Sequence, residues 1–466
     1  MKSSIRIFVI LSFVFLTNQI WSQDEGQITK EMLNTYRTTL NVDQSITAVI
    51  NAVTNNEINK LAMNRNNLGK VDTYFKYQVK IKGITDQKSS GRCWLYTGLN
   101  VLRIKIIENY NLDQFEFSQN YSFFYDQLEK ANLFLEGIIA TREKPMDDRT
   151  VEWFFRHPVG DGGQWTGVVD IVTKYGLIPA EVMPETNSST NTRMMSRFIR
   201  GKLREFGLEL REMHKNSASV SDLRSKKENM LSDIYRLLVI TLGEPPETFT
   251  WRYKDTEGNL SELKEYTPLS FYKEIVNIDL NDYIMFMNDP SRPYNKLFEI
   301  EYDRHMQEGK NWKYINLPVT QIKEFALLSI MDNEAMYFSC DVGKQLDKER
   351  GYLDINNYDY NALFGISFDM DKKQRIITGE SSSSHGMALI GVDVDDKNVP
   401  DKWLLENSWG SDAGFNGYLI MTDDWFDEYM FRVVIHKKYV ADKILNILDQ
   451  EAIKLPPWDP MFLPEE

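Results

Sequence analysis

Four residues of this chain have types, order and spacing that could carry out nucleophilic catalysis. They are Gln87, Cys93, His385 and Asn407. A cysteine attacks an amide carbonyl as its thiolate, and a nearby histidine can take the thiol proton and later protonate the leaving amine. Asn407 could orient the imidazole, while the Gln87 amide and the Cys93 backbone N–H could donate hydrogen bonds to the developing oxyanion. The four residues therefore predict acyl transfer through a thiol.

The pattern around Cys93 predicts a helix that would support this chemistry. Apolar residues recur at helical spacing from Leu95 to Tyr110, and Gly91 lies just before them. We therefore expect a helix over 93–110 with Cys93 at its N-terminus. The positive end of a helix dipole stabilises an anion, which favours the thiolate.

The rest of the chain divides into a helical first part and a strand-rich last third, which predicts an α+β fold with two lobes. The tail contains four prolines after residue 455, so we expect it to be extended. Helices are expected over 117–140, 168–175, 190–242 (as two helices) and 319–332, a hairpin over 248–266, and strands over 335–342, 385–393, 402–409 and 416–421.

Each part of the catalytic pattern also has an ordinary structural explanation. A cysteine at a helix start is commonly inert, a histidine before glycine is commonly a turn or core residue, and Asn407-Ser408-Trp409-Gly410 could be a simple turn. Trp409 could shield a hydrogen bond between Asn407 and His385 from water, or it could be a core residue. The combination and its order, rather than any single residue, favour catalysis.

Composition and charge limit the kinds of molecule that the chain is expected to bind. The chain has 466 residues, 42% hydrophobic and 26% charged, which is enough for one large domain or two to three smaller ones. A net charge of −14 repels phosphate backbones and argues against nucleic acid as a main partner. We interpret the basic run between Arg193 and Arg204 as a solvated helix face or a subunit contact.

The cysteines and histidines favour neither a disulfide nor a metal site. Only Cys93 and Cys340 occur, and a nucleophilic Cys93 must remain a thiol. Cys340 lies in an apolar strand pattern and is interpreted as a small buried residue. None of the five histidines has a zinc-ligand spacing to a cysteine or to another histidine. We expect no metal and no cofactor.

The N-terminus has the pattern of an export signal. Lys2 and Arg6 precede an apolar run over 7–16, and Ser22 offers a cleavage point. The run is shorter than the roughly 20 residues of a membrane span. We therefore expect a protein that is exported to the periplasm or secreted after cleavage near Ser22, with no membrane span in the mature chain. The alternative is an apolar N-terminal core helix.

Longer motifs extend from about residue 80 to 461. They are DQKSSGRCW (86–94), DGGQW (161–165), KYG (174–176), MPET (183–186), CDVGK (340–344), SHGM (384–387), ENSWG (406–410), GYL (417–419), DWFDEY (424–429) and LPPWDPM (455–461). With these motifs the chain resembles the bleomycin hydrolase and aminopeptidase C family of papain-like cysteine peptidases.

The resemblance implies a fold with a helical lobe, a β-barrel-like lobe, a large helical insertion and a C-terminal tail directed to the active site. It implies an aminopeptidase that acts on short peptides and assembles as a ring-shaped homohexamer. It also implies that Gly162 and Gly163 let the substrate backbone lie close to the cleft, where a simple turn is the alternative. The tail carboxylate, here that of Glu466, would bind the substrate's N-terminus.

The resemblance and the element pattern together suggest domain limits. His385 follows Cys93 by 292 residues, more than the ~130–150 of papain-like enzymes, and the surplus fits an insertion. The limits are 1–22 (signal peptide), 23–80 (N-terminal extension), 81–189 (helical lobe with the nucleophile), 190–310 (mostly helical insertion), 311–443 (β-rich lobe with His385 and Asn407) and 444–466 (tail).

Two departures from the family pattern keep alternatives open. Family members are mostly cytosolic, whereas this chain begins with an export signal. The residues after Met461 are Phe-Leu-Pro-Glu-Glu rather than the small residues usual there. A cysteine endopeptidase or acyltransferase on the same scaffold is the first alternative to the aminopeptidase, and an inactive binding or assembly relative is the second.

Overall fold

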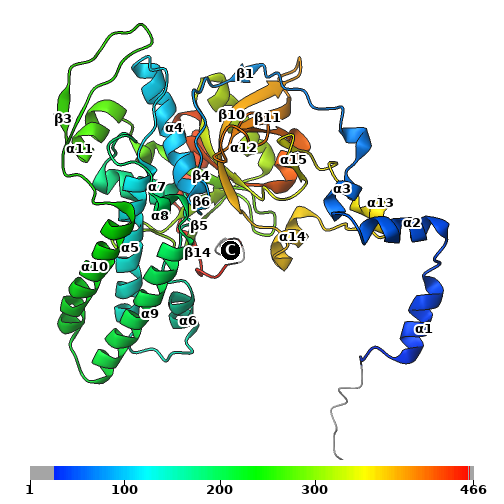
Figure 1. Ribbon diagram of the computed structural model, residues 1–466, viewed down its shortest axis with the longest axis horizontal. Helices are drawn as coiled ribbons and strands as arrows, with labels where there is room; N and C mark the ends of the chain where they lie inside the picture. The colour runs from blue at the N-terminus through cyan, green and yellow to red at the C-terminus, as the bar shows by residue number, and fades with distance from the viewer. Residues whose placement is uncertain (1–25, 460, 462–466) are drawn as a thin grey trace, which may run out of the picture.

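The structure is a computed structural model that describes residues 26–459 and residue 461. The predicted signal peptide and Glu466 lie outside these residues. Helices gather on one side of the molecule and a large sheet lies on the other (Figure 1). Helix α4 (Cys93–Asn109) packs against strands on one side and against helices α5 and α7 on the other. The expected α+β fold is confirmed.

The helical side is built around α5 (Gln119–Ala140), against which α9 (Arg193–Lys215) and α10 (Val220–Leu242) pack. Both α9 and α10 bury one apolar face, as the predicted stripes require. The shorter elements of this side are α6 (Arg149–Arg156), α7 (Trp165–Tyr175), α8 (Asn187–Thr190), β2 (Phe249–Trp251), β3 (Lys264–Tyr266), α11 (Pro268–Phe271), η2 (Tyr272–Val276) and η3 (Leu280–Asp282).

The described strands of the other side form one mixed sheet. Its order is β14 (Ile453–Leu455), β5 (Lys296–Ile300), β6 (Lys313–Asn316), β4 (Tyr283–Met287), β13 (Met430–His436), β7 (Met336–Cys340), β10 (His385–Val394), β11 (Pro400–Glu406), β12 (Tyr418–Thr422), β9 (Tyr352–Leu353) and β8 (Leu346–Asp347), while β1 (Tyr77–Gln78) pairs with β10. Within the described residues the path is open, so the β-rich lobe is a sheet and not the barrel-like closure that we expected.

Two strands of the main sheet fall within the expected insertion, 190–310. Strands β4 and β5 precede residue 311, yet they pair with β6 and β13 in the main sheet. Both strands are only five residues long and lie between Asn- and Asp-rich loops, so the sequence pattern did not separate them from the insertion. The loop over 301–312 between β5 and β6 carries His305, which is buried against the helical side.

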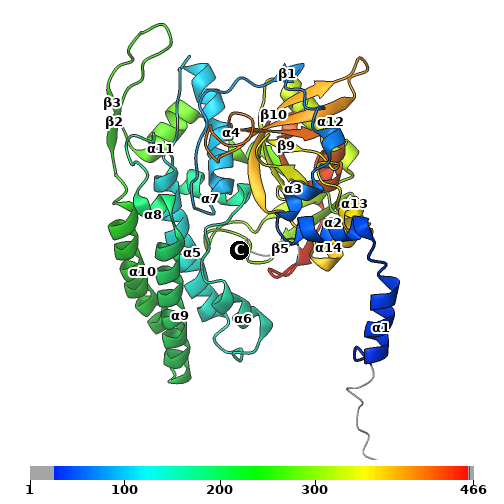
Figure 2. The same ribbon diagram turned by 45° about the vertical axis from the view of Figure 1, so that its right-hand side comes forward.

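The remaining helices flank the sheet or extend the N-terminus. They are α1 (Lys30–Thr39), α2 (Gln44–Val53), α3 (Ile58–Ala62), η1 (Arg65–Asn67), α12 (Val319–Met331), α13 (Tyr360–Phe364), α14 (Lys372–Thr378), α15 (Asp423–Tyr429), η4 (Lys437–Tyr439), α16 (Asp442–Leu445) and η5 (Asn446–Asp449). Helix α1 projects away from the body of the molecule in both views and buries no residue (Figures 1 and 2). None of the helices in the described residues has the length and apolar character of a membrane span.

The tail is anchored as far as the structure describes it. Strand β14 pairs in parallel with β5. Beyond it, Asp459 forms an ion pair with Arg292, and Arg432 of β13 donates a hydrogen bond to the carbonyl oxygen of Met461 at 3.0 Å. Met461 is buried. The tail therefore returns to the body of the molecule before its last five residues.

Candidate active site

Cys93 is the first residue of α4 and is buried. The side chain of the N-cap residue, Arg92, does not cap the N-terminus of α4. The preceding Arg92 instead pairs with the Glu185 carboxylate through two hydrogen bonds of 3.0 and 2.7 Å. The partial positive charge of the helix start therefore acts on the Cys93 thiol, where it favours the thiolate.

His385 begins β10, and the residue after it lets that strand approach α4 closely. A Cβ atom on Gly386 would lie 3.2 Å from Thr97 Oγ1 and 3.6 Å from Trp94 Cα. Since Trp94 and Thr97 lie in the first turn and a half of α4, this approach places His385 beside the turn that begins with Cys93. Residues 292 positions apart in the sequence are brought together in this way.

Asn407 holds the imidazole of His385. It follows the end of β11, the neighbour of β10, and its Oδ1 lies 2.8 Å from His385 Nε2. The same Oδ1 accepts a hydrogen bond from the Ser408 backbone N–H at 2.8 Å, which fixes the orientation of the amide. Because Oδ1 can only accept, Nε2 carries the proton and the other ring nitrogen, Nδ1, is the one left to exchange a proton with the thiol.

The surroundings of His385 exclude water. The Trp409 ring stacks on the imidazole with 4.9 Å between centroids and an interplanar angle of 30°. Burial lowers the pKa of His385 to about 4, with the Asn407 hydrogen bond opposing the shift. An imidazole in this environment gains a proton readily only when an anion forms beside it, so its protonation is coupled to ionisation of Cys93.

Gln87 is oriented by the loop that follows Asn407. Its Oε1 accepts a hydrogen bond from Ser408 Oγ at 2.6 Å, and its Nε2 donates to the Ser90 carbonyl oxygen at 2.7 Å. An amide nitrogen carries two hydrogens, so one remains for an oxyanion. Ser408 therefore links the predicted oxyanion donor to the residue that orients the imidazole. It is a supporting residue that the sequence pattern did not single out.

A buried ion pair ties the strand of Asn407 to the helix of Cys93. Arg103 of α4 forms a hydrogen-bonded pair with Glu406 at the end of β11, and both side chains are buried. Burial raises the pKa of Glu406, although Arg103 opposes that shift. The pair fixes the relation between α4 and β11, and thus between Cys93 and Asn407.

Residues 160–163, which we call the glycine loop, lie beside α4. Trp94 Nε1 donates a hydrogen bond to the Asp161 carbonyl oxygen at 2.7 Å. A Cβ atom on Gly163 would lie 2.3 Å from His305 Cε1 and 2.7 Å from the Trp94 ring, whereas one on Gly162 would meet nothing within 4 Å. Gly163 is therefore required by packing, and Gly162 borders open space.

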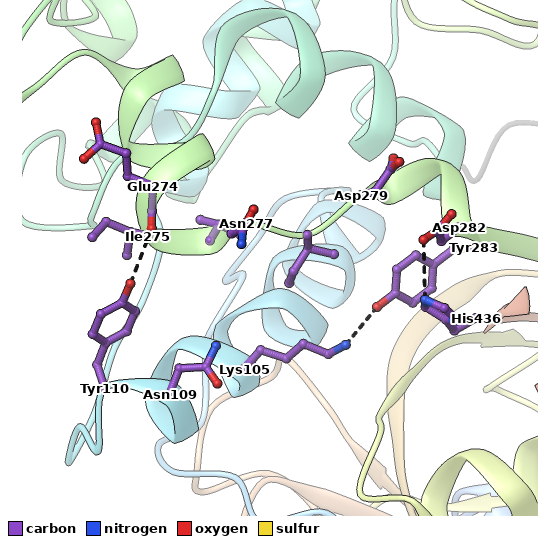
Figure 3. A pocket seen from close by; sticks show the side chains of 12 residues that line it. Lys105, Asn109, Tyr110, Glu274, Ile275, Asn277, Asp279, Asp282, Tyr283 and His436 are labelled. Atoms are coloured by element: carbon purple, nitrogen blue, oxygen red, sulfur yellow. Dashed lines mark hydrogen bonds and ion pairs between the residues drawn. The ribbon is translucent and has the colours of Figure 1, made fainter. Parts of the chain in front are cut away.

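A polar cavity of about 380 Å³ lies elsewhere, between η2 and the C-terminal ends of α4 and β13 (Figure 3). Lys105 lines it, twelve residues and about 18 Å along α4 from Cys93. Its ammonium is already bonded to Tyr283 Oη and Glu334, and Tyr110 Oη donates to the Glu274 carbonyl oxygen. The cavity contains none of the predicted catalytic residues and is separate from the candidate site.

No group of three or more potential metal ligands occurs within residues 26–459 and 461. The chemistry of the candidate site is that of a thiol, an imidazole and two amides.

Comparison with known proteins gives consistent matches over nearly the whole chain. The model of the Peptidase C1-like family matches residues 27–462. Mouse bleomycin hydrolase is 40% identical over 434 residues, covering 91% of this chain and 95% of that protein. Aminopeptidase C of Lactobacillus delbrueckii subsp. lactis is 36% identical over 441 residues, covering 93% and 98%. The crystal structure of PepW from Lactobacillus rhamnosis superposes with a TM-score of 0.91 at 36% identity, covering 94% and 99%.

Proposed function

Because the chain belongs to the Peptidase C1-like family, we propose that it is an exported enzyme that removes N-terminal residues from peptides through a Cys-His-Asn mechanism. The resemblance to bleomycin hydrolase and aminopeptidase C is confirmed, and the chain is a cysteine-type aminopeptidase. The proposal concerns the residues that perform the reaction, the part that the tail plays in cleavage from the N-terminus, the assembly and the location.

In the proposed reaction, the Cys93 thiol proton moves to His385 Nδ1 and the thiolate attacks the carbonyl carbon of the scissile amide. The oxyanion accepts hydrogen bonds from Gln87 Nε2 and the Cys93 backbone N–H. His385 then protonates the leaving amine, which yields the acyl-enzyme. A water molecule that loses its proton to His385 attacks the thioester, and Cys93 is released as the thiolate.

The contact between His385 and Asn407 is the observation that carries this assignment. It fixes both the direction of the imidazole and the ring nitrogen that is available to the thiol. The approach of Gly386 to the first turns of α4 supplies the second condition, which is proximity to Cys93.

The anchored tail supports cleavage from the N-terminus. Arg432 holds Met461, and the five residues after Met461 could extend by about 17 Å. We propose that the Glu466 carboxylate lies in the cleft and pairs with the substrate's ammonium group. A blocked cleft end with a charge of this kind turns an endopeptidase site into an aminopeptidase site.

We further propose that the protein assembles as a homohexamer. Support comes from α1, whose apolar side chains Met32, Leu33 and Tyr36 are exposed, as is Leu40 just after the helix. A helix of ten residues is marginal in water, and exposed apolar patches commonly mark interfaces. A second copy of the chain would cover this face, which analytical ultracentrifugation of wild type and of a Met32→Glu, Tyr36→Glu variant can test.

Export is proposed from the basic start, the apolar run and the small residue at Ser22. The enzyme would then act in the periplasm or outside the cell. N-terminal sequencing of the protein purified from its native host provides the test, with a start near residue 23 as the expected result. A mature protein that still begins at Met1 contradicts export.

The catalytic proposal is tested by hydrolysis of fluorogenic aminoacyl amides. Wild type should cleave them, and Cys93→Ala should reduce the rate to background. Efficient cleavage of N-terminally blocked peptides would favour the endopeptidase instead. A Cys93 that fails to react with a thiol-directed peptidase inhibitor would favour an inactive binding protein.

A further inference from the structure

The side chain of Lys130 binds two carbonyl oxygens of the glycine loop and one carboxylate oxygen of its own helix. Its Nζ donates hydrogen bonds to the carbonyl oxygens of Gly160 at 3.1 Å and Gly162 at 2.7 Å, and it pairs with Asp126 Oδ2 at 2.8 Å. Lys130 and Asp126 are one turn apart on α5. The ammonium therefore connects a rigid helix to two backbone groups beside the nucleophile.

These bonds determine where the N–H of Gly163 points. In a trans peptide unit, the carbonyl of Gly162 and the N–H of Gly163 face opposite directions. Since the Gly162 carbonyl faces Lys130, the Gly163 N–H faces away from it. In the part of the chain that the structure describes, this N–H has no hydrogen-bond acceptor. It is a backbone donor of fixed direction to which no described residue offers an acceptor.

His305 completes the support from the opposite lobe. Its Nδ1 lies 2.5 Å from Asp126 Oδ1. Although burial alone would raise the pKa of Asp126, Lys130 and His305 hold it below its ordinary value, so Asp126 is a carboxylate and His305 Nδ1–H donates to it. The imidazole packs edge-on against Trp94, with 4.7 Å between ring centroids.

The same imidazole fills the space beside Gly163 of the glycine loop and Gly167 of α7. A Cβ atom on Gly163 or on Gly167 would lie 2.3 Å from His305 Cε1. Asp126 thus joins Lys130, which holds the loop through its carbonyls, to His305, which holds it through packing. Gly163 is therefore held by Lys130 through the loop carbonyls and by His305 through packing.

We propose that Lys130 is a positioning residue of the peptidase reaction, whose ammonium fixes the glycine loop so that the Gly163 N–H is directed at the backbone of a bound peptide. The inference rests on the proposed function. Lys130 does not touch the substrate and acts through Gly163. Asp126 and His305 hold Lys130 and the loop in place.

The test separates reactions that use the substrate backbone from a reaction that does not. Rates of hydrolysis of unblocked tripeptidyl fluorogenic amides are compared with rates of Cys93 alkylation by iodoacetamide, which has no peptide backbone. The variants are Lys130→Met, which removes all three donors, and Lys130→Arg, which keeps a cation with several donors.

Lys227→Met is the matched control. Lys227 has a side-chain exposure of 14%, against 11% for Lys130, and also bonds to α5, through Asn132 Oδ1 and Glu136. It makes no contact with the glycine loop. Its substitution should lower the midpoint of thermal unfolding about as much as Lys130→Met does and leave peptide hydrolysis unchanged.

Lys130→Met should lower kcat/KM for the peptides by about 10- to 100-fold, as expected when hydrogen bonds to a charged group are lost. Alkylation by iodoacetamide should stay within about twofold of wild type, and Lys130→Arg should recover part of the loss. Equal losses in hydrolysis and alkylation, or no recovery in Lys130→Arg, would overturn the positioning role. An unchanged kcat/KM in Lys130→Met beside an active wild type contradicts this inference alone, whereas an inactive wild type contradicts the proposed function as well.

Discussion

Asn407 Oδ1 lies 2.8 Å from His385 Nε2 and also 2.8 Å from the Ser408 backbone nitrogen, so one oxygen accepts two hydrogen bonds. The Asn407 amide nitrogen has no partner in the described part of the chain. An exchange of the oxygen and nitrogen of this amide would direct an N–H group at the Ser408 N–H. The amide orientation, and with it the imidazole tautomer, is therefore set by the backbone.

Replacement of Asn407 by Ala removes the group that orients His385. The loss of a buried hydrogen bond leaves the Nε2–H unpaired, which costs about 1–3 kcal/mol. We expect kcat/KM for aminoacyl amides to fall by about 10- to 100-fold, and we expect the same cost to lower the thermal midpoint by about 1–3 °C. Steady-state kinetics of Asn407→Ala and Asn407→Gln measure the effect. An Asn407→Ala enzyme as active as wild type would show that Trp409 alone suffices to hold the ring.

Gln87 and Ser408 should affect the rate to different extents. Gln87→Ala removes the proposed donor to the oxyanion, and the loss of one such donor reduces kcat by about 10²- to 10³-fold. Ser408→Ala removes only the hydroxyl that orients the Gln87 amide, so we expect a loss of about tenfold.

The double variant Gln87→Ala, Ser408→Ala tests whether Ser408 acts through Gln87. Because Ser408 acts through Gln87, the double variant should be no slower than Gln87→Ala alone. If the losses in rate of the two single variants multiply in the double variant, Ser408 does not act through Gln87, and its role is limited to the structure of the loop.

Burial of His385 makes stability depend on pH when the thiol is absent. Its pKa is about 4 in the folded protein against about 6.5 in an unfolded chain. The unfolded state therefore binds more protons between these values, and stability falls as the pH falls from about 6.5 towards 4. In a Cys93→Ala background, which removes coupling to a thiolate, the free energy of unfolding should drop by about 2 kcal/mol between pH 7 and pH 5.

Urea unfolding at both pH values measures this drop. The double variant Cys93→Ala, His385→Asn serves as the control because it lacks the titrating ring at this site. Its loss of stability over the same range should be smaller by about 2 kcal/mol. Equal losses in the two variants would mean that the folded site accommodates the imidazolium.

The residues expected to act on the substrate could be selected from the sequence because each belongs to a short motif. Cys93 begins an apolar helical stripe, and His385 and Asn407 lie at the ends of neighbouring strand patterns. The residues that support them could not be selected in this way. Ser408 meets Gln87 across 321 positions and His305 meets Asp126 across 179, and no local pattern encodes such contacts.

The fold shows the same division between local and long-range information. The helices at 93–109, 193–215 and 220–242 follow apolar spacing that can be read within one element. Whether a set of strands closes into a barrel, and which strands β4 and β5 join, depends on pairing between distant segments. The sequence pattern therefore predicts the elements but neither the open edge of the sheet nor the place of β4 and β5 within it.

Alanine substitutions at the adjacent residues Gly162 and Gly163 should have different effects, one on stability and the other on substrate binding. Neither has a positive φ, so alanine is compatible with the backbone at both positions. At Gly163 an added methyl group would overlap His305 and Trp94, so Gly163→Ala should destabilise the protein by about 1–3 kcal/mol. At Gly162 it would enter open space, so Gly162→Ala should fold as wild type does.

If peptide backbone lies against Gly162, the same methyl group should raise KM by tenfold or more. Thermal unfolding and peptide kinetics on both variants test this, and a Gly162→Ala enzyme with unchanged KM would limit the substrate-binding role to the Gly163 N–H.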